Sequence, residues 1–466
     1  MIRTYAFART LYCRSVTSSQ IWKAPKGVWR VPCCPGLYQN VNCQLDSGKS
    51  FATEIPICKE RDAHHTTLNM CPHGVQVRAD ENTRMLHVAL EDGNVASFPY
   101  IWLRDSCLCS ECHSPSSRSR SLLMAELNVD VKASAFQVDP TTGDIEVTWD
   151  DGHVSTYQLD WLKKHNFSAE ARRCRLSDTY LKGGKKFWGA ELNGNIPRFD
   201  FKEVISDNEQ MYRFLDTIRV TGIAVVHNAP QDTGVVVTLG NAIAFIRPCN
   251  YGDTFQVYTR PDPKNAAYTA GALEMHTDLS YFDYMPGVQF LHCIKQSNMG
   301  GTNQFADGYY AAENIRKSNL AAFNLLAETV VDFHDMGHDQ HVGDYLQQSR
   351  GTTIQLDGDG NYNHVRISNH GRCDFLNTDK EHAREWYKAY ILLYHSFYAK
   401  ENMVEYKMEP GEIICFDNVR VLHGRSAIFA NFGGEGSLPE RHLEGAYVDW
   451  DAWNSKLRSL REELGR

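Results

Sequence analysis

Two histidines and one aspartate are the residues whose types and spacing best suit metal chemistry. His276 and Asp278 form an H-x-D in a segment of extended character, where alternate side chains share one face. His423 follows far downstream on another predicted strand. Two imidazoles and one carboxylate leave three positions open on an octahedral ion, as Fe(II) requires when it binds a chelating cosubstrate and O2. An H-x-D alone also occurs where a surface histidine stands beside an acid.

Three thiols form a second possible metal site. Cys107, Cys109 and Cys112 follow a C-x-C-x-x-C pattern, and His113 and His153 are the candidates for a fourth ligand. Zinc favours four soft or borderline ligands in a tetrahedron, and a small domain gains stability from such a site. The 14 cysteines among 466 residues are too few for a disulfide scaffold. A disulfide and free buried thiols are the alternatives to zinc.

The elements that position the histidines and the aspartate are predicted to be mostly strands. Alternating apolar patterns predict strands at 222–227, 287–294, 352–356, 412–416 and 442–447. Residues 190–466 are therefore predicted to fold mainly as β structure with flanking helices, in a double-stranded β-helix (jelly-roll) whose open mouth can hold a metal. Composition alone does not distinguish this barrel from other β sandwiches.

Two helices are predicted to interrupt these strands. The clearer one begins at a capping box formed by Thr378 and Glu381. It then carries an apolar stripe at helical spacing, which predicts core packing rather than a site, made of Trp386, Tyr390, Leu393 and Phe397.

The cysteines lie in a region that predicts a separate, smaller domain. Short strands are expected at 75–78, 85–90, 135–138 and 145–149. A stretch rich in Gly, Lys and Asn then marks a boundary near residue 190. Residues 74–175 are predicted to form a β-rich N-terminal zinc-binding domain.

The first 45 residues differ in composition from the rest. The first acidic residue is Asp46, whereas several arginines and lysines precede it among Ser, Thr, Ala and aromatic residues. This pattern predicts a mitochondrial transit peptide at 1–45, followed by a linker at 46–73, and hence a matrix location. A disordered tail without an address, or a wrongly chosen start codon, would leave the protein in the cytoplasm.

The bulk composition excludes some classes of protein. The formal net charge of −9 is spread along the chain and argues against a nucleic-acid partner. No run approaches the eighteen or so apolar residues of a membrane span. A chain of 466 residues that is 42% apolar can bury a sizeable core, which predicts two or three domains and excludes a binding module of minimal size.

Three long segments resemble the gamma-butyrobetaine and trimethyllysine dioxygenase family of Fe(II)- and 2-oxoglutarate-dependent oxygenases. They are HTDLSYFDYMPGVQFLHCIKQ at 276–296, FDNVRVLHGR at 416–425 and RHLEGAYVDWD at 441–451. The similarity extends from about residue 74 to the C-terminus. It implies that His276, Asp278 and His423 bind Fe(II). It also implies a zinc site with His153 as the fourth ligand.

The resemblance further implies that Arg441 binds the distal carboxylate of 2-oxoglutarate. A guanidinium offers a planar fork that matches a carboxylate, which a lysine does not; a surface salt bridge is the alternative role. Arg441 and Tyr447 would both face the barrel interior unless a bulge at Gly445 intervenes. Asn303 is a second candidate for a cosubstrate contact, or a turn residue after two glycines.

The family's aromatic cage for a quaternary ammonium corresponds to four residues of this chain. Aromatic faces suit this cation because it cannot donate a hydrogen bond. By resemblance the cage is Tyr251, Phe255, Tyr268 and Tyr447, with Asn265 near the substrate carboxylate. Each ring alone would be an ordinary core or rim aromatic.

Three features depart from the family pattern. Phe255 stands where the family usually has tryptophan, and Leu279 stands where gamma-butyrobetaine dioxygenases have tyrosine. The loop from 424 to 440 is longer and richer in glycine than is usual. Substrate affinity or choice is therefore open.

The implied reaction is hydroxylation of gamma-butyrobetaine at C3 to L-carnitine, a step of carnitine biosynthesis. It consumes O2 and 2-oxoglutarate, releases succinate and CO2, uses ascorbate as reductant, and is expected in a homodimer. Two alternatives to this function remain. The first is a trimethyllysine dioxygenase, which acts earlier in the same pathway and would need an acidic partner for the substrate's α-amino group. An inactive trimethylammonium-binding protein would not need the intact metal site.

Overall fold

The computed structural model describes six stretches of the chain, with short gaps between them: 69–70, 75–89, 93–258, 266–339, 343–429 and 441–466. The predicted transit peptide and nearly all of the predicted linker lie outside these residues. None of the described helices has the length and apolar character needed to cross a membrane.

The N-terminal part is built from small antiparallel sheets. The first has the order β1-β2-β3-β4, with bounds Asn69–Met70, Gln76–Asp80, Met85–Ala89 and Val95–Pro99. The second has the order β7-β8-β9, with bounds Ala133–Val138, Ile145–Trp149 and Val154–Tyr157. A two-stranded ladder joins β5 (His113–Ser114) to β6 (Ser119–Arg120).

Alternation along these strands explains their packing. Val77, Leu86 and Val147 are fully buried in one shared cluster, while their neighbours along each strand are more exposed. This part also contains three helices. Helix α1 (Tyr100–Asp105) follows β4, and helices α2 (Leu159–Lys164) and α3 (Ala169–Asp178) follow β9. A short 3-10 turn, η1, covers Met124–Glu126.

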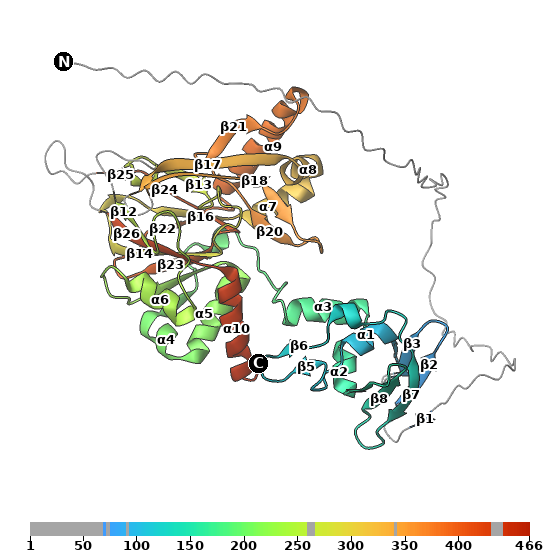
Figure 1. Cartoon of the computed structure of the whole chain (residues 1–466). Helices are drawn as coiled ribbons and strands as arrows, with labels where there is room; N and C mark the ends of the chain where they lie inside the picture. The colour runs from blue at the N-terminus through green and yellow to red at the C-terminus, as the bar shows by residue number, and fades with distance from the viewer. Residues whose placement is uncertain (1–68, 71–74, 90–92, 259–265, 340–342, 430–440) are drawn as a thin grey trace, which may run out of the picture. The chain divides into compact units, whose positions relative to one another are not determined.

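The C-terminal part contains two facing sheets. The larger has the order β10-β11-β23-β14-β26-β12, with bounds Arg198–Asp200, Ile223–His227, Ile413–Asp417, Val288–Lys295, His442–Val448 and Phe255–Tyr258. The smaller has the order β13-β24-β16-β22, with bounds Leu273–His276, Val421–Arg425, Asn303–Asp307 and Val404–Tyr406. The predicted double-stranded β-helix is confirmed (Figure 1).

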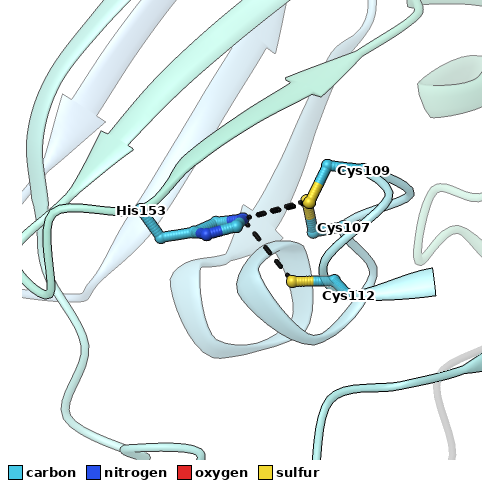
Figure 2. Close-up of side chains that lie close together, drawn as sticks. All are labelled: Cys107, Cys109, Cys112 and His153. Carbon is cyan, nitrogen blue, oxygen red and sulfur yellow. Dashed lines mark hydrogen bonds between the residues drawn. The ribbon is translucent and has the colours of Figure 1, made fainter.

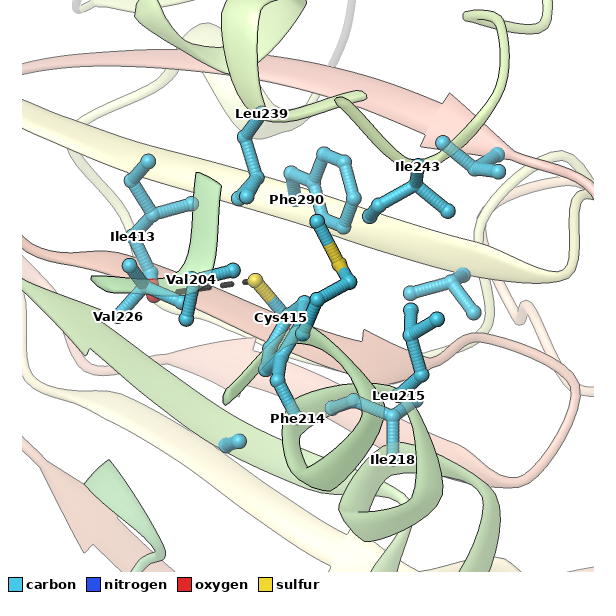
Figure 3. Packing of buried hydrophobic residues seen from close by; sticks show 14 of the residues in the cluster. Val204, Phe214, Leu215, Ile218, Val226, Leu239, Ile243, Phe290, Ile413 and Cys415 are labelled. Atoms are coloured by element: carbon cyan, nitrogen blue, oxygen red, sulfur yellow. Dashed lines mark hydrogen bonds between the residues drawn. The ribbon is translucent and has the colours of Figure 1, made fainter. Parts of the chain in front are cut away.

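Helices cover the outer face of the larger sheet. They are α4 (Phe201–Ser206), α5 (Asn208–Thr221), α6 (Val235–Ile243) and α10 (Trp450–Glu463). Figure 3 shows Phe214, Leu215 and Ile218 of α5 packed near Ile413 and Cys415 of β23, all within one buried cluster. This hydrophobic layer stabilises the larger sheet, which carries several of the candidate site residues.

The inner faces of the two sheets enclose a second cluster. On β23, Ile413 and Cys415 face the helices, whereas Ile414 and Phe416 belong to the inner cluster. The same alternation on β26 directs Ala446 to the helices. Residues 441, 443, 445 and 447 are thereby directed to the interior between the sheets, where Leu443 is buried.

Helices α7 (Gly308–Ser318), α8 (Leu320–Glu328) and α9 (Lys380–Tyr398) pack with the smaller sheet and with two further ladders. These have the orders β18-β17-β21 and β19-β20, with bounds Gly343–Thr352, Val330–Asp339, Arg372–Leu376, Ile354–Leu356 and Tyr362–Val365. Two-residue strands β15 (Met299–Gly300) and β25 (Ile428–Phe429) pair separately. Single turns η2 (Ala190–Leu192) and η3 (Ala266–Tyr268) complete the elements.

The prediction that two helices interrupt the strands between residues 222 and 447 was wrong, since the described residues of this range contain four, α6 to α9. Several of these helices are short, so their apolar residues show too few helical repeats to be distinguished from the alternating patterns of the neighbouring strands. The predicted apolar stripe of α9 is confirmed, because Trp386, Leu393 and Phe397 are fully buried. Its capping box is wrong: the N-cap residue is Asp379, and no side chain caps the helix there.

Candidate active site and metal centres

The two histidines of the predicted iron site face each other across a strand pair. His276 ends β13 and is the register partner of His423 on β24. Both are buried, and their ring centroids are 4.3 Å apart. Asp278 lies just beyond the end of β13, so strand alternation is not what directs its side chain, contrary to the sequence argument. Instead, Asn418 accepts a hydrogen bond from the Asp278 backbone nitrogen (2.8 Å) and donates to its carbonyl oxygen (3.0 Å).

The ligand atoms are arranged as a bound cation would require. Asp278 Oδ1 lies 3.0 Å from His276 Nε2 and 3.7 Å from His423 Nε2. Two ligand atoms at right angles, each about 2.1 Å from an ion, are about 3.0 Å apart. His276 Nδ1 donates to the carbonyl oxygen of Glu274 (2.8 Å). In the neutral ring, the Nε2 lone pair therefore faces a carboxylate oxygen, and a metal ion between them would satisfy both.

The second oxygen of Asp278 is held by two donors. Tyr447 Oη donates to Oδ2 at 2.8 Å, and Gln289 Nε2 donates to it at 2.7 Å. Burial opposes ionisation of Asp278, but the adjacent imidazoles of His423 and His276 and the hydrogen bond from Tyr447 outweigh it and lower its pKa. Burial, reinforced by His276, lowers the pKa of His423 to about 3. The site therefore presents a carboxylate and a neutral imidazole, the forms that bind metals.

Arg441 lies in the interior with one partner and one open donor. Its Nη2 donates to Asn303 Oδ1 at 3.0 Å, and its buried Nε has no hydrogen-bond partner among the described residues. Burial, with the nearby charge of Arg425, lowers its pKa to about 10, so it is still cationic at neutral pH. An open, buried guanidinium donor suits a carboxylate ligand. Arg441 has no carboxylate partner among the described ion pairs, so the alternative role of a surface salt bridge does not describe it.

Asn303 is a strand residue rather than a turn residue. It begins β16, pairs with Arg425 and Tyr406, and is buried. Its Nδ2 donates to the Tyr406 carbonyl oxygen at 3.2 Å, which leaves Oδ1 to hold Arg441. In this structure Asn303 positions the arginine.

Arg425 is a buried residue that the sequence prediction missed. Its guanidinium donates to the carbonyl oxygens of Gly271 (2.6 Å) and Thr269, in the segment that follows Tyr268. Its place in the H-G-R of the second resembling segment was the available signal. Arg425 ties the segment carrying Tyr268 to β24.

Two aromatic rings stack beside the metal ligands. Phe255 on β12 and Tyr447 on β26 have centroids 5.2 Å apart and planes inclined by 25°. Their strands pair in unbroken register, with Phe255 opposite Gly445, so no bulge occurs at Gly445. A Cβ at 445 would overlap the Phe255 ring, which explains why glycine is needed there.

A cavity of about 90 Å³ joins these rings to the metal ligands. Tyr251 and Tyr268 line it together with Phe255 and Tyr447, so the structure brings all four predicted cage residues to one place. Asp335, His334, His370 and Tyr281 also line it, and the sequence analysis predicted none of these. His334, Asp335 and His370 lie outside the three resembling segments, so no local pattern indicated them, whereas Tyr281 lies within the first segment, close after Asp278.

Two predicted features are only partly described. Asn265 and residues 430–440 of the predicted long loop lie outside the described residues. Leu279 is buried and has a φ of 54°, a left-handed conformation that is unfavourable for a leucine. Such a residue next to a metal ligand is typical of a backbone constrained by function.

The three thiols converge on His153 (Figure 2). Its Nε2 lies 3.3 Å from Cys107 Sγ, 3.6 Å from Cys109 Sγ and 3.5 Å from Cys112 Sγ. In a tetrahedron with usual zinc bond lengths, a sulfur and a nitrogen ligand are about 3.5 Å apart. His113 is not part of the group, and none of the described cysteines forms a disulfide.

Charged neighbours support the thiol cluster. Arg104 Nη1 donates to Cys112 Sγ at 3.3 Å, and Glu111 lies 3.6 Å from His153 Nδ1. Burial nevertheless raises the pKa of the Cys112 thiol to about 11. A metal ion would overcome this, because coordination deprotonates a thiol.

Comparisons with known proteins agree with this geometry. Residues 177–447 match the family model of the taurine catabolism dioxygenase TauD, TfdA family. Residues 77–186 match the model of the gamma-butyrobetaine hydroxylase-like N-terminal domain. The first match covers more than half of the chain and includes every residue of the candidate iron site.

Curated relatives cover most of the chain. Gamma-butyrobetaine dioxygenase of Homo sapiens is 36% identical over 389 residues, 84% of this chain and 97% of the relative. The Pseudomonas sp. (strain AK-1) enzyme of the same name is 33% identical over 80% of this chain and 93% of its own. Trimethyllysine dioxygenase of Bos taurus is 30% identical over 77% and 81%. The chain is therefore a dioxygenase and belongs to the gamma-butyrobetaine dioxygenase family.

Proposed function

We propose that this enzyme hydroxylates gamma-butyrobetaine to L-carnitine with Fe(II), 2-oxoglutarate and O2, releasing succinate and CO2. The observation that carries the proposal is the single cavity in which His276 and Asp278 meet the four aromatic residues. The greater identity to gamma-butyrobetaine dioxygenases than to trimethyllysine dioxygenases favours this substrate. An inactive binding protein would have been free to lose the metal ligands and Arg441.

His276, Asp278 and His423 would hold Fe(II) on one face and leave the other positions open. Bound there with 2-oxoglutarate, the ion would supply oxidative chemistry that inserts one oxygen atom of O2 into a C–H bond. The other atom enters succinate. Tyr447 and Gln289 fix Asp278 Oδ2, so that Oδ1 stays directed at the ion.

Arg441 would bind the distal carboxylate of 2-oxoglutarate. Asn303 holds one end of its guanidinium, which presents the remaining donors in a fixed orientation. Burial strengthens such a contact because water does not compete with it. Ascorbate, as a reductant that keeps the iron in its Fe(II) form, completes the proposed cofactor set.

The four rings of Tyr251, Phe255, Tyr268 and Tyr447 would hold the trimethylammonium group. A cation over an aromatic face gains roughly 0.5–2 kcal/mol, more in a dry site. Binding at this end would position the substrate carbon nearest the metal, and the rings exclude water from it. Phenylalanine at 255 supplies a smaller π face than tryptophan would.

The test is to incubate the purified protein with Fe(II), ascorbate and 2-oxoglutarate and to measure succinate with each candidate amine. Gamma-butyrobetaine should stimulate succinate release and yield carnitine in equal amount. Succinate release that is stimulated by trimethyllysine and not by gamma-butyrobetaine would identify trimethyllysine as the substrate instead.

We propose that Cys107, Cys109, Cys112 and His153 bind one structural zinc ion. Support comes from the near-equal distances from the three thiols to one imidazole nitrogen. A small domain stabilised in this way is common because metal binding contributes directly to folding free energy.

We also propose a mitochondrial matrix location and a homodimer. The location rests on the composition of residues 1–45, and a fluorescent protein fused to them should enter mitochondria. A cytoplasmic signal would favour the alternative. The dimer rests on the family resemblance, and sedimentation of the purified protein tests it.

A further inference from the structure

The cavity contains a second carboxylate that the metal site does not use. Asp335 lies on β17, where alternation places it on the same face as Val331 and Phe333. Those two residues are buried, with exposed fractions of 0% and 1%, whereas Met336 on the opposite face is 63% exposed. Asp335 therefore points inward, and it lines the cavity.

Asp335 contacts one of the cage tyrosines. Tyr251 Oη donates a hydrogen bond to Asp335 Oδ2 at 3.3 Å. Tyr281 is their neighbour: burial raises its pKa, and the nearby Tyr251 and Asp335 raise it further. The carboxylate is thus adjacent to the aromatic cage, and it accepts a hydrogen bond that makes the Tyr251 ring more electron-rich.

The charge of Asp335 has no cationic side chain facing it within the described lining. That lining contains no lysine and no arginine, and its carboxylates are Asp278 and Asp335. The imidazoles of His276 and His423 lie beside Asp278 Oδ1. The tyrosine hydroxyl is a neutral donor, so the charge of this partly buried carboxylate is not compensated, and a cationic ligand would offset the cost of burying it.

We propose that Asp335 is the counter-charge for the quaternary ammonium group and sets the enzyme's preference for a cation over a neutral group of the same shape. This inference rests on the proposed function and deepens it. Aromatic rings alone favour a cation modestly, whereas a carboxylate within several ångströms adds direct Coulomb attraction. Asp335 acts on binding of the substrate, not on the metal or on 2-oxoglutarate.

The test compares two ligands that differ only in charge. Gamma-butyrobetaine and 5,5-dimethylhexanoate, in which a tert-butyl group replaces trimethylammonium, are titrated calorimetrically into the Fe(II) and 2-oxoglutarate complex without O2. The preference for the cation is the dissociation constant of 5,5-dimethylhexanoate divided by that of gamma-butyrobetaine. In Asp335→Asn this ratio should be roughly tenfold lower than in the wild type. Asp335→Glu should restore part of it. The dissociation constant of 2-oxoglutarate, measured first, should be unchanged in both variants, which shows that the site is folded.

A matched control removes one negative charge from the same hairpin. Asp344 on β18 has a side chain that is 95% exposed, and Asp344→Asn should leave the ratio unchanged. An unchanged ratio in well-folded Asp335→Asn would overturn the assignment of Asp335 alone. Trimethyllysine is titrated in the same way, and an Asp335→Asn variant that loses affinity for trimethyllysine alone would also overturn it, because Asp335 would then face an α-amino group. A wild-type protein that does not bind gamma-butyrobetaine would overturn the proposed function itself.

Discussion

The ring of Phe255 occupies the space that a side chain at position 445 would need, and it lies against Tyr447 in the same strand pair. Gly445 is therefore part of the cage even though it contributes no side chain. In the proposed cage, this relationship would link a backbone position to substrate binding.

Gly445→Ala should force Phe255 away from Tyr447, because the new methyl group and the ring cannot share this space. We expect the KM for gamma-butyrobetaine to rise by about tenfold, within the 1–3 kcal/mol usual for overpacking. The KM for 2-oxoglutarate should be little changed. In Gly445→Ala combined with Phe255→Ala, the two effects should not add, and simple additivity would contradict the steric explanation.

Arg441→Lys should raise the KM for 2-oxoglutarate by about tenfold, because a forked contact becomes a point charge. Asn303→Ala should have a smaller effect in the same direction, since it frees Arg441 without removing it. Steady-state kinetics with 2-oxoglutarate varied at saturating amine measures both. If neither variant alters this KM, another residue binds the carboxylate.

Zinc should copurify at about one ion per chain and be absent from Cys109→Ser, which should melt several degrees lower. Elemental analysis and a thermal melt of protein purified without chelators give both values. Cys174→Ser, at an exposed cysteine outside the cluster, is the control and should retain zinc. Wild-type protein that contains no zinc would contradict the proposed zinc site.

Buried histidines should make the protein less stable in acid. Burial lowers the pKa of His292 to about 4, whereas an unfolded histidine takes up a proton near pH 6.5. Stability is therefore full above about pH 6.5 and falls as the pH decreases toward 4. In His292→Gln the free energy of unfolding should decrease less between pH 6.5 and pH 4 than in the wild type, by up to about 3 kcal/mol. Urea unfolding at several pH values measures this difference. An unaltered slope would show that His292 is not the group responsible.

The strands were more predictable than the positions of the polar residues. The strands at 287–294 and 442–447 were located within one residue at either end, because alternating apolar patterns report which face is buried. Asp278 was expected within a strand but lies beyond its end, where Asn418, distant in sequence, fixes it. Asn303 resembled a turn residue because glycines precede it, although pairing with β22 and β24 makes it a strand residue.

The unpredicted site residues share one cause. Asp335 lies outside the three resembling segments and acts through Tyr251, 84 residues away, whereas Gln289 lies inside the first segment and reaches Asp278 only because the chain turns back between them. Tertiary packing creates these contacts, so spacing within the sequence does not report them. The cysteines are the opposite case, because three of the four ligands are neighbours in sequence and only the choice between His113 and His153 needed the fold.

The central claim is that His276, Asp278 and His423 support hydroxylation of gamma-butyrobetaine. The most direct measurement is carnitine and succinate formed by wild-type protein and by Asp278→Ala, each supplied with Fe(II), ascorbate, 2-oxoglutarate, gamma-butyrobetaine and O2. We predict equal amounts of both products from the wild type and neither above background from a folded Asp278→Ala. Absence of carnitine from the wild type, or substantial turnover by Asp278→Ala, would contradict the account.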